Sequence, residues 1–205
     1  MTLKRVTCIG SVFVKALLAR LLRAHPALSF EVRLQDGFAD LVRDGIDLAV
    51  RMGELRDSTL EARGVDWLRI VMVASQPYLK AHGTPRRLED LAGHRAVAYR
   101  IPSTGRSRPW QLRQGRRTVE IHPAQSVQVS DTETLATAAL LGMGVTQLPD
   151  HIVQDEVARG KLVPLLPDHR PAPMPISAVA PSGQRVPPRV QVLLEALEGP
   201  RERGG

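Results

Sequence analysis

The stretch Ile46–Leu55, IDLAVRMGEL, decides the fold because it joins a buried strand to a charged side chain. Four of its first five residues are apolar, a pattern typical of a strand that is covered on both faces. Arg51 follows without a preceding turn, and Gly53 allows a sharp exit from the strand. An arginine at this point either marks the place where the chain leaves the sheet or faces a group that attracts positive charge.

Helix and strand patterns alternate around this stretch. Residues 4–10 and 29–35 have strand patterns, and residues 15–24 place leucines on one helical face. Residues 38–45 form a short helix pattern that ends at Gly45. The order strand, helix, strand, helix, strand predicts parallel pairing with right-handed crossovers, and therefore an α/β fold.

The alternation continues along the chain with one interruption. Further strand patterns occupy residues 68–74, 125–130, 145–149, 161–166 and 176–182, and further helix patterns begin at residues 76, 131, 150 and 187. Between residues 84 and 124 the chain is rich in Pro, Gly and Arg, which favours loops. We expect short antiparallel strands there, such as residues 95–100.

Composition restricts the function classes. The 205 residues suffice for one large or two modest domains. The 28 Lys and Arg residues exceed the 21 Asp and Glu residues, but only 3% of the chain is aromatic, which disfavours stacking on single-stranded nucleic acid. The basic pairs Arg86-Arg87 and Arg116-Arg117 lie in separate loops without a helix-turn-helix pattern, so we interpret them as solvated.

The sequence predicts a cytoplasmic protein. Its single cysteine, Cys8, excludes an internal disulfide and fits a reducing compartment. No apolar run reaches the roughly 20 residues that cross a bilayer. The N-terminal apolar stretch is broken by Lys15 and Arg20 and precedes no small-residue cleavage site, so we expect no signal peptide and no membrane partner.

No pattern in the chain predicts catalysis. No serine lies in a G-x-S-x-G elbow, and the six histidines are neither paired at helical spacing nor grouped with acids as metal ligands. The chain also lacks the glycine spacing of a phosphate-binding loop. We therefore predict no catalytic residue, no metal and no cofactor, and a binding cleft remains the best hypothesis.

The start of the helix after residues 125–130 has the residues of a binding site. Ser130 or Asp131 is the expected N-cap, and Ser130 with Glu133 matches a capping box. A helix N-terminus at the carboxyl end of a strand also binds small anions in α/β sheets, and Thr132 and Thr134 add hydroxyl groups there. Capping and anion binding both remain open at this point.

Residues 38–63 resemble the signature stretch of the effector-binding domain of LysR-type transcriptional regulators. Further segments are similar in the same order, so the resemblance extends from Val6 to Leu197; they are residues 73–95, 129–153, 160–168 and 173–197. The resemblance implies two Rossmann-like α/β lobes with a hinge, as in type II periplasmic binding proteins, and a small effector in the cleft between them.

The resemblance also implies the division of the chain and the effector contacts. Lobe I is expected at residues 1–75 and 177–205, and lobe II at residues 76–176, with crossovers near Ala74-Ser75 and Ile176-Ser177. The expected effector contacts are Gly10, Ser11, Asp36, Arg51, Gly53, Pro102, Ser103, Thr104, Ser130, Asp131 and Thr132. Arg51 indicates either a small carboxylate effector or a salt bridge that locks the lobes.

The expected function is that of a ligand-sensing, oligomerising regulatory domain, which forms a homodimer or a higher homo-oligomer. The roughly 80 to 90 residues that carry the winged helix-turn-helix and linker helix in the family are absent, so we expect DNA binding only through a module outside this chain. The chain is then a fragment, a truncated product or a stand-alone sensor. A stand-alone small-solute-binding protein is the alternative, and an enzyme is the third hypothesis.

Overall fold

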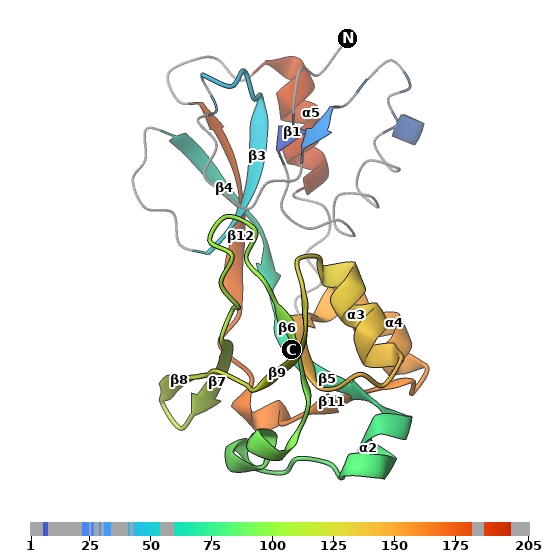
Figure 1. Cartoon of the computed structure of the whole chain (residues 1–205). Coiled ribbons are helices and arrows are strands. Elements are labelled where there is room, and N and C mark those ends of the chain that lie inside the picture. The colour runs from blue at the N-terminus through green and yellow to red at the C-terminus, as the bar shows by residue number, and fades with distance from the viewer. Residues whose placement is uncertain are drawn as a thin grey trace. The chain divides into compact units, whose positions relative to one another are not determined.

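The structure is a computed structural model in which the chain divides into two compact units (Figure 1). Unit 1 comprises Met1–Leu68 and Met174–Gly205, and unit 2 comprises Arg69–Pro173. Unit 2 is therefore one continuous segment, inserted into unit 1. The residues that the structure describes are 6–7, 22–24, 26, 29, 31–33, 41, 43–53, 60–181 and 187–197.

Unit 1 contains a five-stranded sheet in the order β2-β1-β3-β12-β4. Its strands are β1 (Val6–Thr7), β2 (Val32–Arg33), β3 (Leu48–Met52), β4 (Leu60–Leu68) and β12 (Met174–Pro181). Strand β1 pairs in parallel with β2 and β3, which confirms the parallel pairing predicted for the first three strands. Strand β12 pairs antiparallel with both β3 and β4, so the sheet is mixed.

Strand β4 has no counterpart among the strands predicted from the sequence. Gly64 interrupts its apolar pattern, and glycine weakens a strand interior. The pairing with β12 shifts between Ile176 and Ser177, so that Val65 has no residue opposite it, which is the pattern of a β-bulge. Because the bulge breaks the period of two, the alternation that identifies a strand is lost at this point.

A tight turn precedes β3. The Ile46 N–H donates to the Leu41 carbonyl at 2.8 Å, and Gly45 has a φ of +61°, in the left-handed region that glycine adopts readily. Leu41 and Ile46 are buried with Ala49 and Val179 in a small core. Half of the helix predicted over residues 38–45 lies outside the described residues, and its described part is a turn.

Unit 2 is built on strand β5 (Ile70–Ser75), which lies between two antiparallel partners, β10 (Thr146–Pro149) and β11 (Leu162–Leu165). The bounds predicted from the sequence put residues 69–75 in lobe I and residues 174–176 in lobe II. The structure puts residues 69–75 in unit 2, because both strands that pair with β5 belong to unit 2, and it puts residues 174–176 in unit 1.

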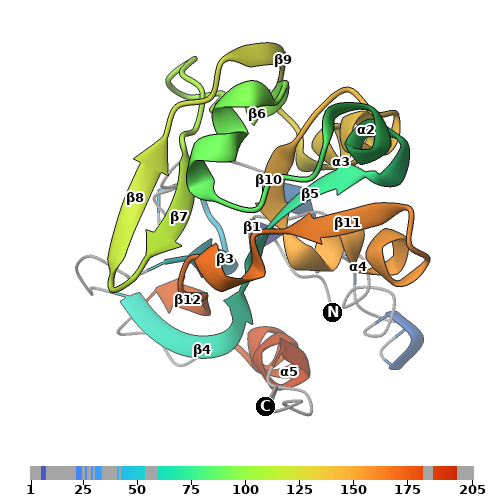
Figure 2. The same cartoon turned by 90° about the horizontal axis from the view of Figure 1, so that it is seen from below.

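Two further pairs of strands complete unit 2. Strand β6 (Ala96–Tyr99) pairs in parallel with β9 (Gln125–Val129), so the antiparallel pairing predicted for residues 95–100 was wrong for this strand. Arg100, just after it, does form an antiparallel bridge, with Ser107. Strands β7 (Trp110–Gln114) and β8 (Arg117–Ile121) form an antiparallel hairpin, as expected for this segment. Figure 2 shows this hairpin at a distance from the helices α3 (Thr132–Leu140) and α4 (Asp150–Ala158).

The pair β6-β9 is joined to the sheet of β5. Ala96 forms a parallel bridge with Val145, the residue before β10. The buried Thr146 hydroxyl donates to the Val97 carbonyl at 2.8 Å. These contacts keep β6 beside β10, and their position determines where the loop after β6 leaves the sheet.

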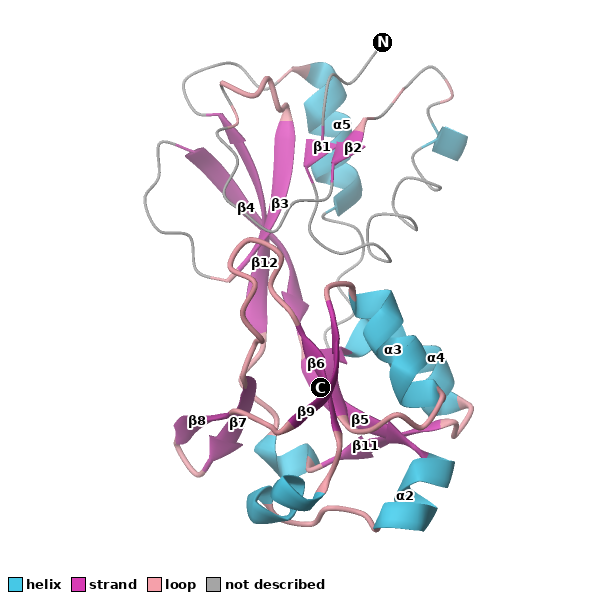
Figure 3. Cartoon of the chain, viewed as in Figure 1, coloured by secondary structure: helices cyan, strands magenta, loops and turns pink. Residues whose placement is uncertain are grey.

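Helices cover the strands of each unit (Figure 3). In unit 2, α3 contacts β5, β6 and β10, α4 contacts β10 and β11, and α2 contacts β5. In unit 1, α5 buries Val190, Leu193 and Leu194, which confirms most of its predicted apolar face; the side chain of Leu197 lies outside the described residues. The bounds are α2 (Gln76–His82), η1 (Leu88–Gly93), α3 (Thr132–Leu140), α4 (Asp150–Ala158), η2 (Pro167–His169) and α5 (Pro188–Leu197).

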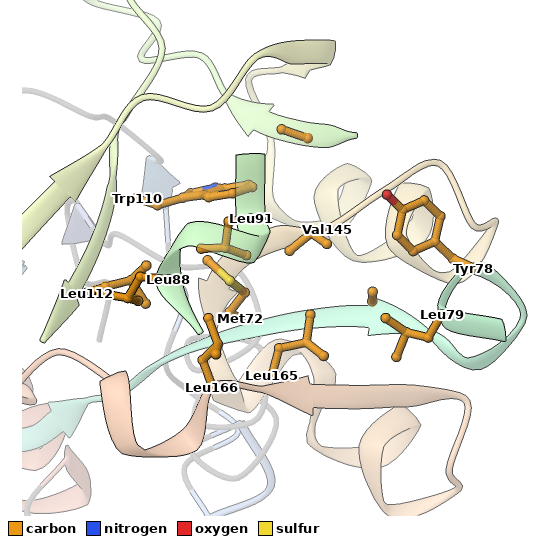
Figure 4. Packing of buried hydrophobic residues seen from close by; sticks show 12 residues of the cluster. Met72, Tyr78, Leu79, Leu88, Leu91, Trp110, Leu112, Val145, Leu165 and Leu166 are labelled. Atoms are coloured by element: carbon orange, nitrogen blue, oxygen red, sulfur yellow. The ribbon is translucent and has the colours of Figure 1, made fainter. Parts of the chain in front are cut away.

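Strand β5 contributes to two cores on its two faces. Val71 and Val73 pack into a core with α3 and α4, and Met72 and Ala74 pack into a core with α2, η1 and β7. This division follows from the period of two along a strand. Figure 4 shows the second core, in which Trp110 is 2% exposed and lies over Leu91.

We predict that Trp110→Ala lowers the free energy of unfolding by roughly 3–5 kcal/mol, because it leaves a large cavity in a closed core. Trp110→Phe is expected to cost much less. It keeps an aromatic ring, and among the described residues none accepts a hydrogen bond from the indole nitrogen. Urea titrations of the two variants measure both losses. Equal losses would contradict the role of Trp110 as a space-filling group.

Candidate functional site

The candidate residues of unit 2 come from the carboxyl ends of two paired strands. Because β6 and β9 are parallel, Tyr99 lies opposite Val129 at the end of both. The Arg100 N–H then donates to the Val129 carbonyl at 2.7 Å. The loop that contains Pro102, Ser103 and Thr104 and the chain that contains Ser130, Asp131 and Thr132 therefore leave the sheet at the same edge. Ligands of α/β proteins bind at such edges.

The loop after β6 is closed by its own backbone. The Ile101 carbonyl accepts hydrogen bonds from the N–H groups of Thr104 at 3.3 Å and Gly105 at 2.8 Å, and the Ile101 N–H donates to the Arg106 carbonyl at 2.8 Å. The Thr104 hydroxyl accepts from the Arg106 N–H at 3.3 Å. Ser103, at the tip, is exposed. The loop thus holds the Ser103 hydroxyl at an exposed tip, on a backbone that these hydrogen bonds keep in place.

Three arginines flank this loop, and the sequence-based selection of site residues missed them. The Arg100 Nε donates to the Gly105 carbonyl at 3.1 Å. The Arg108 guanidinium lies 4.8 Å from the centre of the Tyr99 ring, and its N–H donates to the Tyr99 carbonyl at 2.7 Å. Arg106 is exposed. Three arginines within nine residues were visible in the sequence, but their relation to a sheet edge required the strand pairing.

Asp131 caps helix α3. Its Oδ2 accepts hydrogen bonds from the Thr134 N–H and from the Thr134 hydroxyl, both at 2.7 Å. The capping box predicted for Ser130 and Glu133 was wrong, because the helix begins at Thr132 and Ser130 lies one residue too early to cap it. The carboxylate of Asp131 occupies part of the helix N-terminus that an external anion would otherwise use.

In unit 1, Arg51 lies within β3 and not at its end. It is half-buried opposite Ser177 on β12, and it interacts with another group of the chain. The strand continues through Met52, and the exit is at Gly53, which has a φ of +87° and donates its N–H to the Pro175 carbonyl at 2.8 Å. The remaining candidates, Gly10, Ser11 and Asp36, lie outside the described residues.

Two carboxylates of unit 2 that are not among the candidate residues have lowered pKa values. A hydrogen bond from Lys161, whose Nζ is 3.1 Å from the carboxylate, lowers the pKa of Glu156. Hydrogen bonds from the backbone N–H groups of Arg86 and Arg87 lower the pKa of Asp90. These are structural ion pairs and caps, and in the described part of the chain no three His, Cys, Asp or Glu residues are grouped for a metal ion.

The family model of the LysR substrate binding domain matches residues 3–199. The chain therefore belongs to this family. It is 33% identical over 183 residues to the HTH-type transcriptional regulator CrgA of Neisseria meningitidis serogroup B, a match that covers 88% of this chain and 60% of CrgA. It is also 33% identical over 184 residues to PtxR of Pseudomonas aeruginosa, covering 90% of this chain and 58% of PtxR. The chain spans about three fifths of the length of these relatives.

Solved structures share the fold. The regulatory domain of CrgA, a LysR-type transcriptional regulator from Neisseria meningitidis, has a TM-score of 0.79 and 29% identity, covering 95% of this chain and 97% of that domain. The regulatory domain of AphB from Vibrio vulnificus has a TM-score of 0.80 at 22% identity, covering 96% of each chain. The chain thus has the two-lobed α/β fold of type II periplasmic binding proteins. None of its described helices is long and apolar enough to cross a bilayer.

We predict that Asp131→Ala lowers the free energy of unfolding by about 1 kcal/mol, because two donors of Thr134 lose their acceptor. Ser130→Ala is the matched control, and we expect it to leave stability unchanged. Denaturant titrations compare the two variants. If Ser130→Ala lowers the free energy of unfolding more than Asp131→Ala does, Ser130 is the N-cap, as the capping-box prediction states.

Proposed function

We propose that this chain is the ligand-sensing regulatory domain of a LysR-type transcriptional regulator. The observation that carries the proposal is the family match across residues 3–199. The likeness to regulatory domains supports this function over a free solute-binding protein. The relatives are transcriptional regulators, which supports a binding role and not an enzymatic one.

The effector contacts in unit 2 are Pro102, Ser103 and Thr104, together with the start of α3 from Ser130 to Thr132. Their common sheet edge supports this assignment. In unit 1, Arg51 and Gly53 are proposed as further contacts, with Gly10, Ser11 and Asp36. Units 1 and 2 correspond to the two lobes. One connection between them lies where β4 ends and β5 begins, and the other lies at the start of β12.

The effector is a small carboxylate. The exposed Arg106 beside the Ser103 loop supports this class, since a guanidinium binds a carboxylate through paired hydrogen bonds. The Asp131 carboxylate already lies at the start of α3 and repels a second negative charge there. We therefore assign the selectivity for an anion to the arginines and not to the helix N-terminus.

The whole protein controls transcription in the cytoplasm. It does so as a homodimer or higher homo-oligomer, and it contacts DNA through a helix-turn-helix module like that of the relatives named as HTH-type regulators. Effector binding changes the population of two arrangements of the regulatory domain, because a ligand favours the state that it binds more tightly.

We predict that a small carboxylate raises the melting temperature of the chain. A ligand that binds only the native state stabilises it by about 2.7 kcal/mol at roughly a hundred times its Kd. A thermal-shift screen of small mono- and dicarboxylates, with neutral amides of the same carbon skeletons as controls, measures the effect. If the amides and not the acids raise the melting temperature, the carboxylate assignment is wrong.

Two charge variants test the site. Arg106→Gln is expected to weaken the shift produced by an acid found in the screen, because Arg106 lies beside the Ser103 loop. Arg116→Gln removes the same charge from the turn of the β7-β8 hairpin, and we expect the full shift to remain. Equal losses in both variants would indicate non-specific attraction to the basic surface. If both variants keep the full increase in melting temperature, the effector site lies elsewhere.

A further inference from the structure

Tyr78 lies between two histidines in unit 2. It is 3% exposed, its hydroxyl group is 3.2 Å from Nδ1 of His94, and its oxygen accepts a hydrogen bond from the Arg95 N–H at 2.9 Å. The His82 ring stacks on the Tyr78 ring with 4.3 Å between the ring centres, and its Nδ1 donates to the Tyr78 carbonyl at 3.1 Å. Figure 4 shows Tyr78 at the edge of the core that contains Leu79 and Val145.

The arrangement that gives the Tyr78 proton an acceptor has a neutral His94. The Tyr78 oxygen accepts the Arg95 N–H, and we assign its own O–H as the donor to Nδ1 of His94, 3.2 Å away. Nδ1 accepts this proton only in the neutral imidazole. Protonation of His94 places an N–H against the O–H, so the Tyr78 proton needs a different acceptor in a buried place. A buried hydroxyl without an acceptor is costly.

Burial and the neighbouring His82 also favour the neutral form of His94. Burial lowers the pKa of His94 below the ordinary value of 6.5, and repulsion by His82 of α2 lowers it further. The charge of Asp90 in η1 raises the pKa of His94, but this effect is smaller than those of burial and His82. The folded state therefore binds the proton less well than the unfolded state. The stabilisation is present above pH 6.5 and is lost as the pH falls below it.

The same group of residues contacts the ends of β6 and α3. The Arg95 peptide, just before β6, donates to Tyr78 and accepts from the Val145 N–H at 2.8 Å. Gly144 packs so closely on this peptide that a Cβ atom would lie 2.4 Å from the Arg95 oxygen. A Cβ atom on Gly142, in the turn after α3, would lie 3.9 Å from Cβ of Tyr78.

The opposite ends of these two elements carry the candidate site. Strand β6 leads from Ala96 to the loop of Ser103, and α3 leads back from its end to Asp131. A helix of this length spans about 13 Å. Two ordered elements of one unit therefore connect the Tyr78 end to the loop and the helix start.

We propose that Tyr78, His82 and His94 form a pH-sensitive latch, which is closed at neutral pH and opens in mild acid, and which thereby loosens the loop at residues 100–106. The latch is independent of the proposed function. Only its consequence for effector binding rests on that function.

Hydrogen exchange of the full chain, corrected for the intrinsic rate at each pH, tests the latch between pH 7.5 and pH 5.5. We expect the opening of residues 76–82 and 95–99 to increase as the pH falls, by at most about tenfold for each pH unit per proton bound. We expect residues 100–106 to follow with the same midpoint. If hydrogen exchange at residues 76–82 does not depend on pH, the latch is overturned. If exchange at residues 76–82 depends on pH but exchange at residues 100–106 does not, the coupling to the loop is overturned.

Variants separate titration from packing. His94→Asn keeps an acceptor near the position of Nδ1 but does not titrate, so its exchange should not depend on pH. His82→Gln removes the repulsion between His82 and protonated His94, so it should reduce the total fold-change in hydrogen exchange between pH 7.5 and pH 5.5. His122→Asn, at an exposed histidine outside the group, is the control and should behave as the unmodified chain. If His94→Asn keeps the pH dependence of the unmodified chain, the latch is refuted.

The experiment needs no effector. If no carboxylate binds the chain but the exchange at residues 76–82 titrates through His94, the proposed effector is wrong and the latch stands. If an acid binds and the exchange is independent of pH, the latch alone is wrong.

Discussion

Strand β5 cannot shift its register by a single residue, because its side chains supply both cores of unit 2. Val71 and Val73 face one set of helices, and Met72 and Ala74 face the other. A slip of one residue would exchange the two sets and place each apolar group on the wrong face. The antiparallel partners on both sides hold this register, and the helices α2, α3 and α4 contact the resulting sheet.

The candidate site depends on this register through β10. The Ala96–Val145 bridge and the Thr146 hydroxyl align β6 with β10, and the parallel pairing then aligns β9 with β6. The loop of Ser103 and the cap of α3 therefore both take their positions from the sheet. The same alignment connects the histidines at one end of β6 with the arginines at the other.

Uniform patterns in the sequence predicted the elements well, and pairing was the main source of error. The apolar run of β5 and the Ser75-Gln76-Pro77 start of α2 contain enough local information to be recognised. The direction of β6 was wrong, because a four-residue apolar strand does not encode its neighbour. Ser130 was chosen with Asp131 as a cap because the pattern does not state at which residue the helix begins. The resemblance supplied the loop residues 102–104, but only the pairing placed Arg100, Arg106 and Arg108 around them.

The position of β12 has a consequence for the order in which the units are completed during synthesis. Among the described strands β4 pairs only with β12, which is made after the whole of unit 2 has been translated. Until then β4 is an unpaired strand with its backbone groups exposed, and such strands promote association with other chains. Unit 2, which is continuous, can form both of its cores before that point, whereas unit 1 must wait for contacts between residues more than a hundred positions apart, which form slowly. The nascent chain therefore has a period in which one half is folded and the other is prone to aggregate.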